Sequence, residues 1–318
     1  MWFLDKLFVL KDQPAPRFAF RGTVNWMRGL AMICDNNGFT DSELISKYNQ
    51  VIRRKHNEDA DILAFECLLM SLHNVNALEN FIKTENPYSF VRSAIVTWYY
   101  AIYYASKAMI AASSGINTQT HAKTSKIWQM EIVDKKLVQE PFGFSIVDLT
   151  SKNVESNISS LRGTNSNDLS TTPLDISMSF GAIYSYLKGT AEHEKERLEE
   201  QVKESSEFKQ NKYTSFRTKA AQLLRDRKLQ DANVNFLVQA FRYRGKANYR
   251  DSIYLSYGDD NTSSIIQFEN DLYKTALCFV KMTCYYVSRR VNKDNWINYS
   301  KDLNVYCKFD LPFDLTKI

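Results

Sequence analysis

Glycine and proline are scarce in this chain, and their scarcity limits the possible folds more than any other feature. The 318 residues include 10 glycines and 6 prolines. A β-sandwich with many turns, or a fold with glycine loops that bind nucleotides, needs more of these turn-forming residues. Hydrophobic residues make up 44% and charged residues 24% of the chain, as in an ordinary globular protein. We therefore predict an all-α fold made of long helices.

Three long stretches have the spacing of helices. Residues 58–86 place apolar side chains three or four positions apart, on one face. Residues 90–114 carry apolar side chains on one face and tyrosines on the other, so nearly the whole circumference of this helix needs cover. We predict that it is the central helix of the fold and that it stops at Gly115. The third helix is predicted over about 263–291.

The N-terminal part of the chain has a different texture, with an aromatic start and short helical patterns. Within it, Thr40-Asp-Ser-Glu43 is a capping-box pattern, which predicts a helix that runs to about Arg54. We therefore predict three regions: an N-terminal extension over 1–57, a helical bundle over 58–292 and a C-terminal tail over 293–318.

A loss of helical periodicity predicts a long insertion into the bundle, over about 128–215. In residues 150–173 more than half of the side chains are Ser, Thr or Asn, which predicts a long loop. Residues 190–212 contain seven glutamates and fewer bases, and we interpret them as a solvated helical arm. Two shorter helices are predicted over 215–227 and 232–254.

Charge and cysteine usage indicate a compartment rather than an activity. The net charge of +5, from 41 basic and 36 acidic side chains, permits contact with nucleic acid without requiring it. Five cysteines form an odd set without a Cys-x-x-Cys pair, which indicates free thiols in a reducing compartment. The N-terminus is a poor match to a secretory signal, and the longest uncharged stretch, residues 93–106, is shorter than the roughly 20 residues of a membrane span. We predict a cytoplasmic protein without membrane contact.

The local motifs of common catalytic sites are missing from the sequence. It contains no phosphate-binding Gly-x-x-x-x-Gly-Lys motif, no Gly-x-Gly-x-x-Gly and no Gly-x-Ser-x-Gly. The four histidines do not fall at metal-ligand spacing with each other or with cysteine. We therefore expect no metal and no cofactor, and we expect binding more than enzymatic activity.

Basic residues are concentrated between Lys209 and Arg250, where eleven bases and two acids give a net charge of +9. Arg242, Lys246 and Arg250 recur every four positions and so share one stripe of a helix, with tyrosines between them. Like charges at this spacing repel each other. Either acids elsewhere in the protein, such as those of the glutamate-rich arm, pair with all of these bases, or the stripe contacts phosphates and its tyrosines stack on bases.

Three other residues have structural interpretations. Gly245 inside a predicted helix costs about 1 kcal/mol relative to alanine, which indicates the close approach of another helix or subunit. We interpret His121, which follows the end of a predicted helix, as a surface or capping residue. Trp98 and the tyrosines around it are interpreted as core.

The segment from Arg92 to Ala112 resembles the second helix of HEPN domains. In that family an arginine, a Tyr-Tyr-Ala motif and an Ala-x-x-Ala-Met motif are followed by a glycine and then a histidine, and Gly115 and His121 occupy the matching positions. The sequence from Arg244 to Tyr249 is similar to the family's Arg-x-x-Ala-Asp-Tyr pattern on a later helix. The resemblance covers about residues 58–292.

This resemblance implies an up-and-down helical bundle, usually dimeric, of the kind found in bacterial toxin–antitoxin and phage-defence systems. Catalytic members of the family are metal-independent ribonucleases that use an arginine followed four to six residues later by a histidine. This chain departs from that pattern, because no histidine follows an arginine at that spacing in the matching helix. Asn248 stands at the motif position, and its amide does not act as a general acid or base.

We therefore expect a non-catalytic HEPN-like binding or regulatory subunit that acts through dimerisation, through docking on a partner protein or through contact with RNA. The residues predicted to bind are Arg242, Arg244, Lys246, Asn248 and Arg250. The alternative is a ribonuclease toxin with an altered site, in which Arg244 would stabilise charge at phosphorus and Tyr249 would be a weak proton donor.

Overall fold

Helices dominate the computed structural model, as the scarcity of turn residues predicts. The model describes residues 2, 6, 16–36, 38–162, 168–248, 253, 255, 257 and 262–318. Within these residues the one sheet consists of two short antiparallel strands, β1 (Ile146–Val147) and β2 (Asn233–Val234). The chain is therefore all-α, and this prediction is confirmed.

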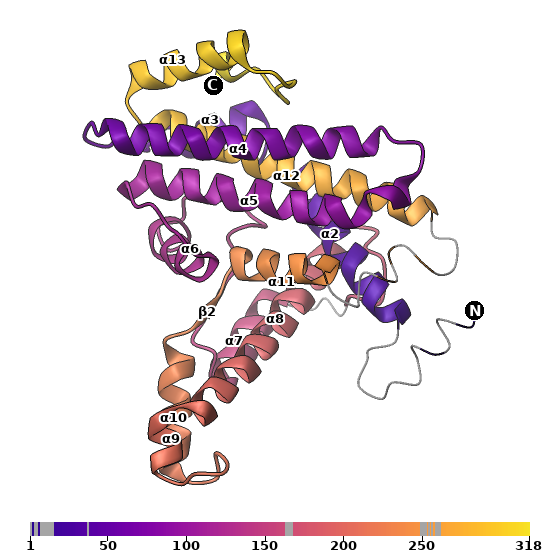
Figure 1. Ribbon diagram of the computed structural model, residues 1–318, viewed down its shortest axis with the longest axis vertical. Helices are drawn as coiled ribbons and strands as arrows, with labels where there is room; N and C mark the ends of the chain where they lie inside the picture. The colour runs from indigo at the N-terminus through magenta and orange to yellow at the C-terminus, as the bar shows by residue number, and fades with distance from the viewer. Residues whose placement is uncertain are drawn as a thin grey trace.

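Three long helices lie side by side and form the body of the molecule (Figure 1). They are α4 (Glu58–Ile82), α5 (Val91–Ser114) and α12 (Thr262–Arg290). Helix α5 packs against α4 and α12 in the body and against α11 (Phe236–Asn248) beneath it, so most of its circumference is buried. This confirms α5 as the central helix, and Gly115 ends it in the left-handed conformation at φ 73°.

The other helices surround this body. Helix α2 packs against α12 and against α8, and α13 lies across the body from α11 and α8 (Figure 1). The outer part of α8 continues away from the body with α9 and α10, and residues 190–230 are here called the arm. The bounds of these helices are α2 (Pro16–Asn36), α3 (Asp41–Tyr48), α6 (His121–Trp128), α7 (Ser151–Arg162), α8 (Ile176–Glu204), α9 (Ser206–Gln210), α10 (Lys219–Gln230) and α13 (Lys293–Tyr306); short turns of 3₁₀-helix span Pro87–Ser89 and Leu315–Lys317, and a π-helical turn spans Gln129–Val133.

The helix that opens at the capping box is shorter than predicted. Both halves of the box form between Thr40 and Glu43, but α3 ends at Tyr48 rather than near Arg54. The next residues cross the C-terminal end of α12 instead. There Arg53 donates to the carbonyl oxygens of Ser288 and Val291, at 3.0 and 2.6 Å. Free carbonyls at a helix end need such donors, so a tertiary contact ends α3 early.

The prediction of a loop over 150–173 is wrong for its first half, which forms helix α7. Its serines and asparagines favour a loop, but Val154 and Ile158 lie four residues apart and both are buried. Before them the carboxylate of Asp148 accepts hydrogen bonds from the backbone N–H of Thr150 and the side chain of Asn153. A short apolar stripe that packs on the core is enough to hold one helical face against the protein.

The structure bears on two expectations, one about membrane-spanning helices and one about the cysteines. The part of the chain that is described has no helix with both the length and the hydrophobicity to cross a membrane. The five cysteines are free thiols, as the absence of a paired spacing predicts.

The core is built around a cluster of aromatic rings that joins four helices. Trp26 of α2 stacks on Tyr186 of α8 at a centroid distance of 4.2 Å and meets Trp98 of α5 edge to face at 5.9 Å. It also packs against Tyr243 and Phe236 of α11, at 4.7 and 6.3 Å. Trp26 is fully buried and its indole nitrogen has no hydrogen-bond partner among the described residues, so packing alone holds it.

Truncation of Trp26 should therefore destabilise the whole protein. We expect Trp26→Ala to lower the free energy of unfolding by about 3–5 kcal/mol, because it removes a large buried side chain and leaves a cavity. Trp26→Phe should cost less, since it retains most ring contacts and removes an unpaired indole N–H. Urea denaturation followed by circular dichroism measures both. Equal losses for the two variants would mean that the stacked rings are not what Trp26 contributes.

Candidate functional site

A cavity of about 750 Å³ opens beside α11, at the base of the arm. Helices α5, α6, α8 and α11 supply most of its wall, and Leu149 and residues 231–233 complete it. Of the residues predicted to bind, Arg242, Arg244 and Lys246 line this cavity. Gly245 lines it as well, so the missing side chain of that residue adds to the open space.

Arg244 is enclosed by aromatic rings. The carbon of its guanidinium lies 4.8 Å from the ring centroid of Phe241, 5.0 Å from that of Tyr99 and 6.0 Å from that of Tyr100. One terminal nitrogen donates to the Tyr100 hydroxyl at 3.3 Å. The inner nitrogen, Nε, is shielded from solvent and has no partner among the described residues, and no described acid forms a salt bridge with Arg244. The rings attract the cation without neutralising it.

His121 lies in the same aromatic group. Its Nδ1 is 2.6 Å from the hydroxyl of Tyr99, and its ring centroid is 4.5 Å from that of Tyr103 and 5.0 Å from that of Phe241. Burial and, to a smaller extent, the charge of Arg244 lower the pKa of His121 below its ordinary value. Our interpretation of His121 as a surface or capping residue is therefore wrong, because it is half-buried in the wall of the cavity.

Tyr99 connects the histidine to the arginine. Burial raises the pKa of the Tyr99 hydroxyl far above its ordinary value, although the neighbouring Arg244 acts in the opposite direction. The hydroxyl therefore stays protonated, and it either donates to Nδ1 of His121 or accepts from it, according to the tautomer of the ring. Among the tyrosines predicted as core, Tyr99 and Tyr103 line the cavity, whereas Trp98 is fully buried as predicted.

Arg242 and Lys246 are fixed by hydroxyls and by one ring. Arg242 donates to Thr190 at 3.1 Å, and its guanidinium carbon lies 5.6 Å from the ring centroid of Tyr186. The ammonium of Lys246 lies 5.4 Å from the same ring and 3.5 Å from the hydroxyl of Thr23. These contacts hold both side chains beside the cavity.

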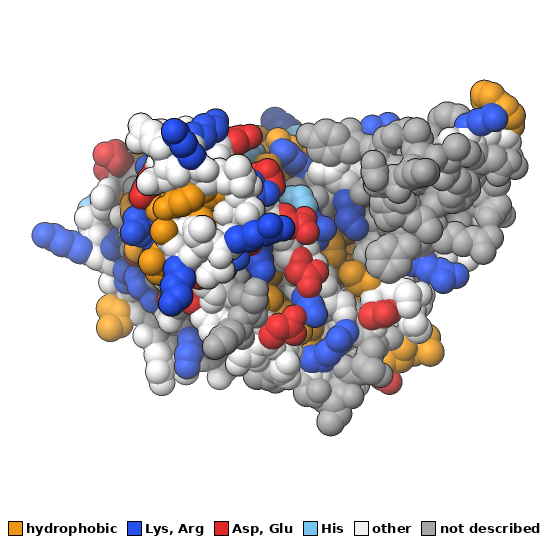
Figure 2. Space-filling view, turned by 90° about the horizontal axis from the view of Figure 1, so that it is seen from below, with side chains coloured by type: hydrophobic (Ala, Val, Ile, Leu, Met, Phe, Trp, Pro, Cys, Tyr) orange, Lys and Arg blue, Asp and Glu red, His pale blue; other side chains and the backbone are white. Residues whose placement is uncertain are grey.

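The glutamate-rich arm pairs with a different part of the basic segment. Arg225 forms salt bridges with Glu199 across the arm, at 4.0 Å, and with Asp226, at 2.7 Å. Seen from the tip of the arm, lysine and arginine side chains are spread over its surface with acidic side chains among them (Figure 2). The tip is therefore of mixed charge, and pairing with the arm holds for Arg225 but not for Arg242 or Arg244.

The cavity itself is electropositive, since bases outnumber acids in its wall. Its bases are Lys126, Arg197, Arg242, Arg244 and Lys246, and its acids are Glu194 and Asp231. Arg197 pairs with Glu194 at 2.6 Å. Counting only the Lys, Arg, Asp and Glu side chains, the described part of the wall carries a net charge of +3, which favours an anionic ligand.

Three of the predicted residues lie at or beyond the end of α11. Asn248 is its last residue, and its side chain is outside the description. Tyr249 and Arg250 lie outside the described residues altogether. Arg92, from the segment that resembles HEPN domains, donates through Nε to the carbonyl oxygen of Ala247 at 3.0 Å and so fixes this end of α11 against α5.

The chain was compared with protein families, with curated proteins and with solved structures. No family model matches the chain, and neither the curated proteins nor the solved structures include one with significant similarity. No group of three or more potential metal ligands from His, Cys, Asp and Glu occurs in the described parts of the chain.

The position of His121 predicts a specific pH dependence of stability. Because the folded protein binds a proton at His121 less readily than the unfolded chain does, stability should be full above pH 6.5 and should fall as the pH drops below it. In His121→Asn this contribution is absent, so the variant should lose less stability than the wild type between pH 7.5 and pH 5, the interval of about one to two units around an ordinary histidine pKa. Urea denaturation across this interval measures the difference, and parallel curves would contradict it.

Proposed function

We propose that this chain is a non-catalytic, HEPN-like subunit that binds a single-stranded RNA segment in the cavity between α5 and α11. The observation that supports this proposal is Arg244, which lines an electropositive cavity and forms no salt bridge with a described acid. Its guanidinium lies beside the rings of Tyr99, Tyr100 and Phe241. Single-strand binders combine cations for backbone phosphates with aromatic faces for bases. Here the two kinds of side chain stand side by side.

The size of the cavity favours a single strand over a duplex. At about 750 Å³ it lies within the range of roughly 300–1,000 Å³ that is typical of ligand sites. That volume accepts one or two nucleotides, and it is too small for a double helix. Phe241 is 42% exposed although it touches Arg244 and His121, so part of its ring is free to stack on a base.

The proposal includes assembly, as a homodimer or with a partner protein, in a bacterial defence or toxin–antitoxin type system. Ile62, Leu69 and Met70 are exposed on α4, at positions that share one helical face. Exposed apolar side chains on one face are typical of a surface that another chain covers. This face belongs to α4, whereas α11 and the cavity lie below α5 (Figure 1).

Removing two cavity bases should weaken binding of RNA and its salt dependence together. We expect Arg242→Gln/Lys246→Gln to reduce the affinity for a single-stranded RNA oligomer. The slope of log K against log salt concentration should become shallower by about 1.4, since each phosphate contact on a single strand contributes roughly 0.7. Fluorescence anisotropy at several salt concentrations measures both quantities.

A matched control exists on α10. Arg227 and Lys228 are exposed and lie outside the cavity wall, so Arg227→Gln/Lys228→Gln removes the same charge elsewhere. The control should keep the wild-type slope. If both double variants changed the slope equally, RNA would be held by the general positive field and not by the cavity.

A ribonuclease remains the second candidate, because of the contact between His121 and Tyr99. Helix α11 of this chain lacks the histidine of the family pattern. His121 of α6, from a distant part of the sequence, lies near Arg244 instead. A histidine of lowered pKa is neutral near pH 7 and so able to accept a proton. Arg244 would then stabilise negative charge that develops at phosphorus.

Cleavage of labelled RNA in the presence of a chelator separates the two candidates. As the protein is proposed to be non-catalytic, we expect the oligomer to stay intact with the wild type and with His121→Asn alike. Cleavage that disappears in His121→Asn would replace the binding proposal with the ribonuclease. His193→Asn is the matched control, because His193 also lines the cavity but does not contact Tyr99.

A further inference from the structure

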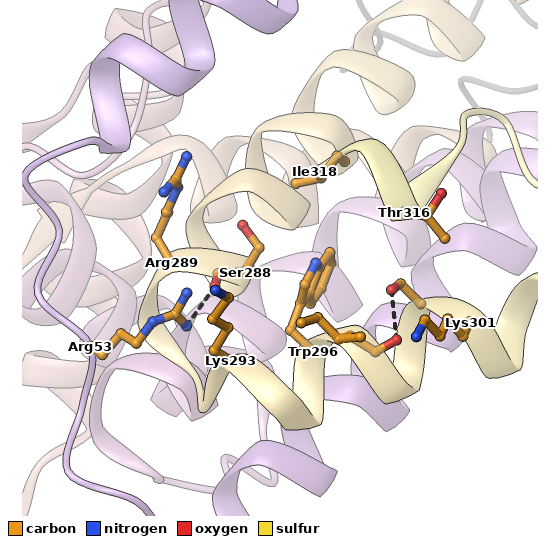
Figure 3. A pocket seen from close by; sticks show the side chains of 10 residues that line it. Arg53, Ser288, Arg289, Lys293, Trp296, Lys301, Thr316 and Ile318 are labelled. Atoms are coloured by element: carbon orange, nitrogen blue, oxygen red, sulfur yellow. Dashed lines mark hydrogen bonds between the residues drawn. The ribbon is translucent and has the colours of Figure 1, made fainter.

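A second cavity lies beside α13 (Figure 3). Helix α13 lies across the body from α11 (Figure 1). The volume of the cavity is about 280 Å³, and it is formed by Arg53, the last turn of α12, the first turns of α13 and residues 316–318. Arg53, Arg289 and Lys293 lie at one end, Trp296 stands in the middle, and Lys301 and Thr316 lie at the other end (Figure 3). None of these side chains takes part in the RNA site.

The charged side chains that line this cavity are all bases. Four bases line it, namely Arg53, Arg289, Lys293 and Lys301, and no acidic side chain does. The structure gives these bases no salt bridge to any described acid, although fourteen other salt bridges are present in the same parts of the chain. The negative charge of Asp294 acts to raise the pKa of Arg53, but Asp294 is exposed and does not line the cavity.

The two arginines are held close together by the backbone. Arg53 donates to the carbonyl oxygens of Ser288 and Val291, which fixes its guanidinium beside the end of α12. Arg289 leaves the same turn of α12, and its Nε is shielded from solvent with no hydrogen-bond partner among the described residues. Burial and the charge of Arg289 lower the pKa of Arg53. An anion between the guanidinium groups of Arg53 and Arg289 would reduce the repulsion between their charges and would supply oxygens that accept hydrogen bonds from them.

The frame that carries these bases is rigid. The carboxylate of Asp61 is buried, pairs with Arg54 and accepts hydrogen bonds from the backbone of Asn292 and the side chain of Asn295, both at 3.1 Å. The turn between α12 and α13 is thereby tied to the start of α4. Trp296 is 5% exposed and forms an apolar wall of the cavity. The backbone that carries Arg289 and Lys293 is therefore fixed before any ligand arrives.

We propose that this cavity is a binding site for a phosphate group, as free phosphate or as a phosphomonoester. Guanidinium groups present paired donors that match the oxygens of phosphate, and lysines add positive charge around it. The volume fits a phosphate with a small organic group, for which the ring of Trp296 offers an apolar face. The site does not depend on the RNA proposal, because it shares no residue with the larger cavity.

Isothermal titration calorimetry of the full chain at constant ionic strength, with inorganic phosphate and separately with glycerol 3-phosphate, tests this site. We expect saturable binding with a Kd of about 1 mM or tighter. Lys293→Gln/Lys301→Gln alters only exposed residues, and Arg289→Gln alters the buried donor; each should weaken binding about tenfold or more. At least tenfold tighter binding of glycerol 3-phosphate would identify a phosphomonoester, and equal binding would identify free phosphate.

Two controls locate the effect. Arg227→Gln/Lys228→Gln removes two exposed positive charges on α10, and Arg242→Gln/Lys246→Gln removes two from the larger cavity. Both should bind phosphate as the wild type does. Circular dichroism and thermal melting show whether Arg289→Gln is folded, and Lys293→Gln/Lys301→Gln provides the answer if it is not. The proposal is overturned if the wild type does not bind, or if the controls and the site variants lose affinity alike.

Discussion

The burial of Trp26 among four other aromatic rings determines where α11 lies, and the larger cavity depends on that position. Trp26 contacts Trp98 of α5, Tyr186 of α8 and Tyr243 of α11, so one side chain of α2 fixes three helices relative to one another. Tyr243 is fully buried and donates to the carbonyl oxygen of Thr23 at 2.8 Å. With Tyr243 directed into the core, helical geometry turns its neighbours to the sides: Arg244 meets the rings of α5, and Arg242 meets α8. The cavity lies where α5 and α8 diverge around α11.

The helices of the body were predictable from sequence because each carries its own information. Helix α5 is apolar around most of its surface, and Gly115 ends it, so no distant contact was needed to recognise either feature. The two wrong predictions about helices, the end of α3 and the loop over 150–173, have the opposite cause. Helix α3 ends early because Arg53 binds the end of α12, more than 230 residues away in sequence. Residues 151–162 form a helix because two spaced apolar side chains outweigh a composition that favours loops. Local patterns do not contain contacts of this kind.

The candidate site likewise contains residues that the sequence pattern predicted and residues that it did not. The four-residue spacing placed Arg242 and Lys246 on one stripe of a helix, and both line the cavity. The spacing did not indicate that Arg244, which lies off this stripe, is the residue enclosed by rings from α5. His121 was misjudged because its environment comes from Tyr99, which precedes it by 22 residues, and from Phe241, which follows much later. Its place after Gly115 in the HEPN-like pattern was the one signal in the sequence that singled it out.

In both cavities, arginine side chains are held in place by contacts that do not neutralise their charge. This shared property favours anionic ligands. A carboxylate that fixed Arg244 or Arg289 would neutralise it and compete with any phosphate. In the described structure aromatic rings and a hydroxyl hold Arg244, and backbone carbonyls hold Arg53 beside Arg289. Rings and carbonyls attract a cation through partial charges, so most of its field remains available to a ligand. Like charges kept together in this way oppose folding. The aromatic core offsets that cost, and the anionic ligands that we propose for the two cavities would remove it.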